Sequence, residues 1–137
     1  MKKLIIHTDG GARGNPGPAG LGVFVTDPEG RVVLEHSRYL GETTNNQAEY
    51  RAVIDALEHA KELGAEELDF FLDSELVVKQ LHHEYKVRDA DLAPLFLRVW
   101  NLCVGFRKVR FTHIRREANQ DADRLVNEAI DRHIKGG

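Results

Sequence analysis

The sequence predicts a single α/β domain built on a mixed sheet of five strands with flanking helices. Three observations lead to this prediction. A length of 137 residues suits one domain with one core. Apolar runs and helical periodicities follow each other in the order β-β-β-α-β-α-α-β-α. Three strands in succession followed by strand–helix units are typical of an antiparallel meander continued by parallel strands. Because no repeat or interdomain linker interrupts the pattern, we expect one domain over residues 1–137.

The strands are recognised by β-branched and apolar residues bounded by turn signals. The first three are expected at residues 2–9, 20–27 and 31–40, with the turn signal "DPEGR" between the second and the third. Residues 67–73 form a short, nearly continuous apolar run, as expected for a strand buried on both faces. The segment "VRFTHI" predicts a fifth strand at residues 109–114.

Four helices are predicted from apolar residues at helical spacing. The first covers residues 46–63, the next two cover residues 74–81 and 92–103, and the last carries an apolar stripe from Ala122 to Ile134. In the third helix we expect Phe96, Leu97 and Trp100 to pack as core, and the single Cys103 to be a core thiol.

The composition excludes several classes of protein. Hydrophobic residues make up 42% and charged residues 30%, which is typical of a soluble globular chain. The sequence has neither an apolar run of about 20 residues nor a signal-peptide layout, so we expect a cytoplasmic protein without membrane contact. A net charge of −3 argues against nonspecific coating of nucleic acid. A basic run still stands between residues 105 and 116, and it suits either phosphate binding or a solvated strand face.

Acidic residues stand where the predicted sheet would place a site. Asp9 and Asp73 each end an apolar run, and the carboxyl ends of neighbouring parallel strands meet at one sheet edge. Glu49 and Asp123 fall in the first turns of two predicted helices. Each acid also has a local explanation: a hairpin turn at Asp9-Gly10, capping by Asp73, a capping box at Glu49, and a favourable helix dipole at Asp123. Together, however, four acids would need a cation, and an all-oxygen site suits Mg²⁺ or Mn²⁺.

Four segments carry a family resemblance: "TDGGARGNPGPAG", "TTNNQAEYRAVIDAL", "FFLDSELVVKQL" and "HIRREANQDADRLVNEA". In this order they resemble the signature segments of ribonuclease HI. The resemblance implies hydrolysis of the RNA strand of an RNA/DNA hybrid, with 5′-phosphate and 3′-hydroxyl ends and two Mg²⁺ or Mn²⁺ ions. It implies that Asp9, Glu49, Asp73 and Asp123 are the catalytic metal ligands. We expect a monomer without an obligate protein partner.

The resemblance also implies contacts to the hybrid. Glycines and polar residues would lie against its minor groove, where the 2′-hydroxyl distinguishes RNA from DNA. The residues concerned are Gly10, Gly11, Asn15, Thr44, Asn45, Asn46, Gln47 and Ser74. One of residues 45–47 is also expected to cap the first helix, and capping is the preferred interpretation of Ser74.

Some positions depart from the family pattern. Many members carry a mobile loop with a histidine before the last helix, whereas here the connection is short and His113 falls within the predicted strand. Arg115 and Arg116 stand closer to the vacated position and are candidates for an auxiliary role. The basic helical protrusion with which many bacterial members grip the hybrid is also absent from the sequence. Glu42 stands where the family pattern has a basic residue of the phosphate pocket. Two alternatives stay open: a DNA-directed carboxylate nuclease of the same fold, and a noncatalytic hybrid-binding module.

Overall fold

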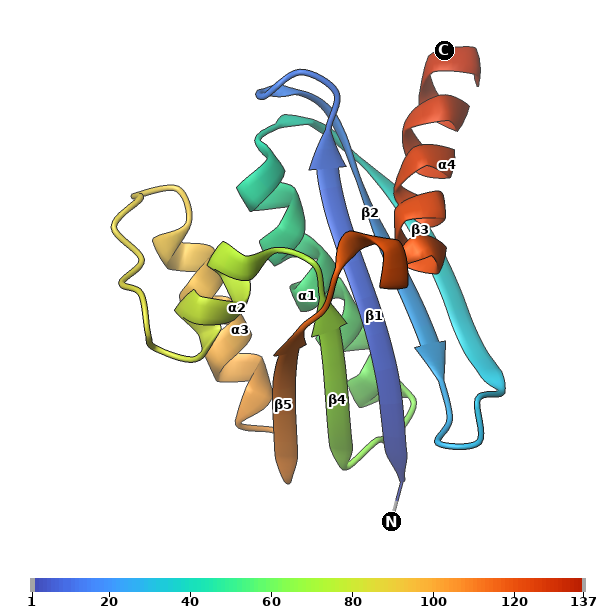
Figure 1. Cartoon of the computed structure of the whole chain (residues 1–137), viewed down its shortest axis with the longest axis vertical. Helices are drawn as coiled ribbons and strands as arrows, with labels where there is room; N and C mark the ends of the chain where they lie inside the picture. Colours follow the sequence, from blue (N-terminus) through green and yellow to red (C-terminus); the bar gives the residue numbers. More distant parts are fainter. Residues whose placement is uncertain (1, 137) are drawn as a thin grey trace.

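The computed structural model describes residues 2–136 as one mixed sheet with helices on both faces (Figure 1). The predicted element order is confirmed. The strands are β1 (Lys3–Ala12), β2 (Gly17–Thr26), β3 (Val32–Thr43), β4 (Glu67–Leu72) and β5 (Lys108–His113). The helices are α1 (Asn45–Glu62), α2 (Glu75–Leu81), α3 (Ala93–Cys103) and α4 (Gln120–Gly136), with a short 3-10 turn at Arg116–Ala118.

The sheet places the ends of β1 and β4 side by side. Its strand order is β3-β2-β1-β4-β5, with antiparallel pairs β1–β2 and β2–β3 and parallel pairs β1–β4 and β4–β5. Thr8 of β1 pairs with Leu72 of β4 at the end of their shared ladder. The next residues are Asp9 and Asp73, so the register brings these two acids to the same edge, as the sequence predicted.

The first strand is longer than expected, and Asp9 does not end it. Beyond Asp9 the strand continues to Ala12, where it pairs with Ala19 of β2. The reversal of the chain follows, closed by the N–H of Arg13 donating to the carbonyl of Pro18 at 2.9 Å. The hairpin turn considered at Asp9-Gly10 is therefore wrong. The glycine-rich segment after Asp9 can remain in the strand because the hydrogen bonds between β1 and β2 are made by backbone groups and require no side chain.

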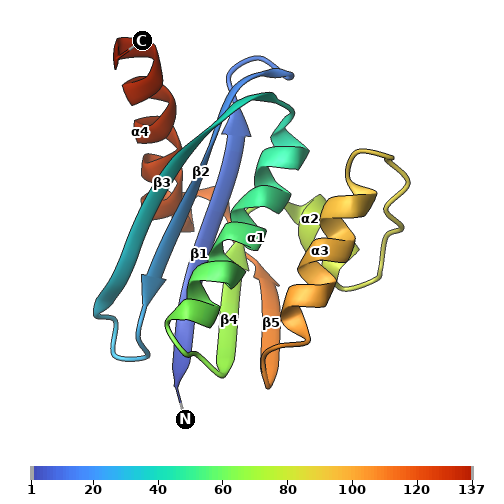
Figure 2. The ribbon, with the colours of Figure 1, turned by 180° about the vertical axis from the view of Figure 1, so that it is seen from behind.

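The main core lies between the sheet and α1, with α3 beside α1 on the same face (Figure 2). Tyr50, Val53 and Leu57 of α1 are fully buried against strand residues such as Ile6 and Phe70. The opposite face is covered by α4 through its apolar stripe, which buries Ala122, Leu125, Val126, Ala129 and Ile130. The sheet is thus clamped between α1 and α4, the two helices that carry Glu49 and Asp123.

The prediction that three large residues of α3 pack as core is wrong for two of them. Leu97 and Trp100 are 59% and 51% exposed, while Phe96 and Cys103 are partly buried. Val99 alone in α3 is fully buried, since this helix contacts the rest of the domain along a narrow stripe. No helix within residues 2–136 is long and apolar enough to cross a membrane.

Candidate active site

The side chains of the four predicted acids line one hollow of about 470 Å³ at the carboxyl edge of β1 and β4. Asp9 lies within β1, Asp73 directly after β4, and Asp123 in the first turn of α4. Glu49 lies in the second turn of α1, because that helix starts at Asn45. Carboxylate oxygens of Asp9, Glu49 and Asp73 all lie within 4.8 Å of one another.

Asp9 and Glu49 are buried, with 7% and 6% of their surface exposed. Burial, reinforced by the negative charge of Asp73, raises the pKa of Asp9 to about 7. Burial, together with the charge of Asp9, also raises the pKa of Glu49 well above its ordinary value. The Oε2 atom of Glu49 is buried and has no hydrogen-bond partner among the described residues. Such a group of carboxylates requires protons or cations for neutralisation.

The donor set fits a hard divalent cation. Every candidate ligand is a carboxylate oxygen, which suits Mg²⁺ or Mn²⁺, and the unpaired Oε2 of Glu49 is a buried acceptor that a cation would satisfy. Asp123 remains outside the tightest group but borders the same hollow and interacts with Asp9. The four side chains therefore form a candidate metal centre of three close acids and one peripheral acid.

Asn119 is a site residue that the sequence did not reveal. It is 1% exposed, and its Nδ2 donates to the main-chain carbonyl of Thr8 at 2.9 Å and to Oδ2 of Asp73 at 3.0 Å. Its own carbonyl accepts from the N–H of Asp123 at 3.1 Å. Asn119 thus joins β1, the end of β4 and the start of α4. An asparagine directly before a predicted helix was the available signal, since asparagine favours helix N-termini.

The polar residues before α1 mainly build the helix start. Thr44 is the N-cap, with its Oγ1 accepting from the N–H of Gln47 at 3.2 Å. The expectation that one of residues 45–47 supplies the cap is therefore wrong, because the helix begins one residue earlier than predicted. Gln47 instead accepts at Oε1 from the hydroxyl of Thr43 at 2.7 Å. Asn46 borders the acidic hollow.

Asn45 ties the β1–β2 turn to the start of α1. Its Oδ1 accepts from the N–H of Ala12 at 2.7 Å, and its own N–H donates to Oδ1 of Asn15 at 3.1 Å. Asn15, which the sequence placed against substrate, is exposed at the tip of this turn. The two hydrogen bonds fix the turn and the helix start relative to each other on one rim of the hollow.

Gly10 and Gly11 both line the hollow, but for different structural reasons. A Cβ at Gly10 would stand 2.2 Å from the main-chain carbon of Ala48, so glycine lets α1 approach β1 closely. A Cβ at Gly11 would meet nothing nearer than 3.9 Å. Ser74 also borders the hollow and caps α2, with its Oγ accepting from the N–H of Val77 at 3.3 Å. The capping predicted for Ser74 is confirmed, and the alternative of capping by Asp73 is wrong.

Of the three auxiliary candidates, Arg116 lies at the acidic hollow. Its Nη2 is 3.8 Å from Oδ1 of Asp123, with 81% of the arginine side chain exposed. Arg115 contributes to a shallow neighbouring surface that Arg116 also lines. His113 is the exposed last residue of β5, paired with Leu72, and is not among the residues that border the hollow.

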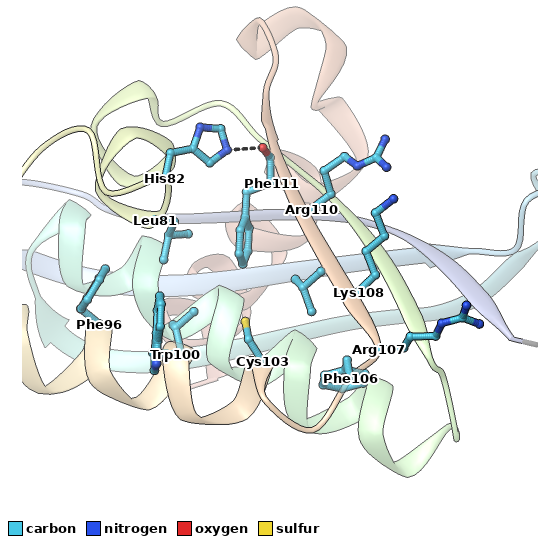
Figure 3. A pocket seen from close by; sticks show the side chains of 12 residues that line it. Leu81, His82, Phe96, Trp100, Cys103, Phe106, Arg107, Lys108, Arg110 and Phe111 are labelled. Carbon is cyan, nitrogen blue, oxygen red and sulfur yellow. Dashed lines mark hydrogen bonds between the residues drawn. The ribbon is translucent and has the colours of Figure 1, made fainter.

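A second hollow, of about 410 Å³, lies between α3 and β5 (Figure 3). Its walls are mainly apolar and aromatic, including Phe96, Trp100 and Phe111, and one rim carries Lys108 and Arg110. The Nε of Arg110 stands 4.0 Å from Oδ1 of Asp69. The basic run of the sequence is therefore divided, because Lys108 and Arg110 lie along β5 whereas Arg115 and Arg116 lie beyond its end.

Comparison with known proteins decides the family. A sequence profile described as "Reverse transcriptase-like" matches residues 7–129. Ribonuclease HI of Halobacterium salinarum is 43% identical over 91% of this chain. The crystal structure of RNase H1 from that archaeon has a TM-score of 0.92 and covers 94% of this chain and 98% of that one. The chain belongs to the ribonuclease HI family. The resemblance seen in the sequence is thereby confirmed.

Two further members of the ribonuclease HI family have closely similar structures. The N-terminal RNase H domain of Rv2228c from Mycobacterium tuberculosis is 40% identical, with a TM-score of 0.94 and 99% coverage of both chains. LC11-RNase H1, isolated from compost, has been solved in complex with an RNA/DNA hybrid. That structure is 47% identical in sequence and has a TM-score of 0.92, and the match covers 96% of this chain and 99% of that one. The chain spans only 36% of the bifunctional mycobacterial protein and 63% of the Halobacterium ribonuclease HI.

Proposed function

We propose that this ribonuclease HI domain hydrolyses the RNA strand of RNA/DNA hybrids, leaving 5′-phosphate and 3′-hydroxyl ends, with two Mg²⁺ or Mn²⁺ ions. The observation that carries the proposal is the convergence of Asp9, Glu49, Asp73 and Asp123 on one hollow. The hybrid-bound structure of LC11-RNase H1 supports the choice of substrate.

The position of each side chain in the hollow determines the role that we assign to it. Asp9 interacts with the other three acids, so it is the natural ligand to be shared between two ions. Glu49 and Asp73 would complete the inner ligands, and the more exposed Asp123 would hold an ion at the open side. Bound divalent ions would lower the pKa of a coordinated water and stabilise negative charge on the phosphate. Asn119 would keep Asp73 oriented for this task.

The rim of the hollow suits a nucleic-acid groove. Gly11 lines the hollow beside the acids, where a Cβ would make only ordinary contacts at 3.9 Å, and the β1–β2 turn is held to α1 by Asn15 and Asn45. We propose that this fixed polar rim contacts the minor groove of the hybrid, with Glu49 near the 2′-hydroxyl beside the scissile phosphate. That hydroxyl would make cleavage specific for RNA.

The direct test is cleavage of an end-labelled RNA/DNA hybrid with Mg²⁺ or Mn²⁺, beside duplex DNA, duplex RNA and each single strand. We expect cleavage of the RNA strand of the hybrid, and we expect Asp9→Asn to abolish it because the shared ligand loses its charge. Cleavage of duplex DNA instead would establish the DNA-directed alternative. Hybrid binding without cleavage under all metal conditions would establish the binding module.

A modified substrate tests the role of the 2′-hydroxyl. We expect one deoxyribonucleotide within the RNA strand to block cleavage at the adjoining phosphate and to leave the other phosphates cleavable. The positions of the products on a sequencing gel report this directly. Equal cutting at the substituted position would show that the 2′-hydroxyl is not read.

A further inference from the structure

A second cluster of potential metal ligands lies outside the acidic hollow. His36 of β3 and Asp55 and His59 of α1 each offer one ligand atom, and these atoms lie within 4.8 Å of one another. None of the three residues lines the acidic hollow. Asp55 follows Glu49 by six residues, which is about 9 Å along a helix axis. This histidine–aspartate cluster therefore joins the edge strand β3 to α1 at a separate place.

The carboxylate of Asp55 is buried, and its charged partners are Arg38 and, when protonated, the two histidines. Asp55 is 5% exposed, and its Oδ2 accepts from Nη1 of Arg38 at 3.3 Å. Its Oδ1 has no hydrogen-bond partner among the described residues that satisfies the geometry of a hydrogen bond. While both neighbouring imidazoles are neutral and no cation is bound, this buried carboxylate oxygen has no positively charged partner, which is costly. The oxygen faces the two imidazole rings.

The two histidines approach this oxygen at distances close to those of ligands around one metal. Nε2 of His36 lies 3.5 Å and Nδ1 of His59 2.9 Å from Oδ1 of Asp55. Two ligands about 2.0–2.1 Å from a tetrahedral zinc lie about 3.3 Å apart. Nδ1 of His59 is also 2.9 Å from the main-chain carbonyl of Asp55, so metal binding would replace that contact. The two rings have centroids 4.6 Å apart.

We propose that His36, Asp55 and His59 bind one zinc-class divalent transition-metal ion. Two imidazole nitrogens and one carboxylate oxygen favour such an ion over Mg²⁺, which prefers oxygen ligands. Arg38 holds Oδ2 of Asp55, which leaves Oδ1 as the single ligand oxygen. The side chains of both histidines are 30% exposed, so solvent reaches the cluster and water can fill the fourth position.

The ion would fasten the edge strand to the helix below it. Among residues 2–136, β3 forms the end of the sheet and pairs with β2 alone, whereas α1 packs against the sheet interior. A ligand that binds the folded state and not the unfolded chain raises stability. Zinc-class ions should therefore raise the melting temperature, independently of the hydrolytic function proposed above.

The test is a Zn²⁺ titration of chelator-stripped protein by calorimetry and thermal unfolding, with excess Mg²⁺ present to occupy the acidic hollow. We expect one site that binds Zn²⁺ more tightly than the remaining surface does, and a higher melting temperature with Zn²⁺ than without it. His36→Gln and His59→Gln should each weaken binding by roughly tenfold or more, because each removes one of three protein ligands. His133→Gln on α4 is the matched control and should bind as the wild type does. Melting without zinc verifies that each variant is folded.

A spectroscopic measurement on the unaltered protein makes the assignment independent of the variants. One equivalent of Zn²⁺ should shift the imidazole NMR resonances of His36 and His59 and leave those of His133 in place. Unshifted resonances of His36 and His59 would overturn the proposal. Equal zinc affinity of the wild type and both glutamine variants would also overturn it, because binding would then belong to the acidic hollow or the surface.

Discussion

The side-chain amide of Asn119 bridges the carbonyl of Thr8 and the carboxylate of Asp73, at 2.9 and 3.0 Å. These hydrogen bonds tie the carboxylate of one inner acid to the neighbouring parallel strand. Asn119 makes them from a buried position at the start of α4, without any charge of its own.

Asn119→Ala should lower both stability and catalysis. We expect a loss of about 1–3 kcal/mol in the free energy of unfolding, because buried acceptors lose their donor. We also expect a higher Mg²⁺ concentration for half-maximal cleavage, because Asp73 loses its orientation. A Mg²⁺ titration of hybrid cleavage at a temperature where the variant is folded measures this. Gln120→Ala, at the exposed neighbouring position, is the control. An unchanged Mg²⁺ dependence would limit Asn119 to a structural role.

Asp9→Asn should stabilise the metal-free protein at alkaline pH. The pKa of Asp9 is raised to about 7 when folded, against about 4 in an unfolded chain. Between these values the folded state binds more protons, so wild-type stability falls as pH rises through this range. The variant lacks the part of this loss of stability that comes from Asp9. Its advantage in melting temperature, measured with a chelator present, should grow from pH 5 to pH 8. A constant difference across this range would contradict the coupling of Asp9 to its acidic neighbours.

The two glycines of β1 allow a matched pair of substitutions. Gly10→Ala should destabilise the fold by about 1–3 kcal/mol, because its Cβ would collide with the backbone of α1 at Ala48. Gly11→Ala has space and should leave stability nearly unchanged. If Gly11 faces the hybrid as proposed, its alanine variant should instead raise KM. Denaturant unfolding and steady-state kinetics of both variants separate packing from substrate contact.

Arg116→Ala should lower kcat by roughly tenfold, which is the scale of one missing charge-assisted contact. Arg116 borders the acidic hollow, whereas Arg115 and His113 are not among its lining residues. An arginine cannot act as a base near neutral pH, so its contribution would be to a phosphate oxygen. Steady-state kinetics of the three single alanine variants tests this ranking. A large kcat loss in His113→Ala alone would reverse it, and a pure rise in KM for Arg116→Ala would indicate substrate binding only.

Much of the fold and the acidic site follows from local sequence patterns. Periodicity identifies each strand and helix, and two apolar runs ending in acids predict that Asp9 and Asp73 meet. What the sequence conceals depends on partners distant in the chain. The hydrogen bonds of Asn119 reach Thr8 and Asp73, and the collision that requires glycine at position 10 is with Ala48. These relationships exist only once the helices are docked on the sheet.

The same reason explains the errors in α3 and the missed histidine–aspartate cluster. Helical spacing predicts an apolar face, but it does not predict how much of that face a neighbour covers, and Trp100 remains half exposed. The spacing of Asp55 and His59 places them on one face of α1. That His36 joins them depends on how α1 crosses β3, which no local pattern specifies.

The parallel pairing of β1 with β4 has a consequence for how activity arises during folding. The two strands are separated in the chain by β2, β3 and α1, so their contact forms only after a long crossover has closed. A partly folded chain with the three-stranded meander and α1 would hold Asp9 and Glu49 but not Asp73 or Asp123. Cleavage activity in a refolding experiment should therefore return only with complete native topology, which makes catalysis a reporter of the long-range pairing of β1 with β4 and of the docking of α4.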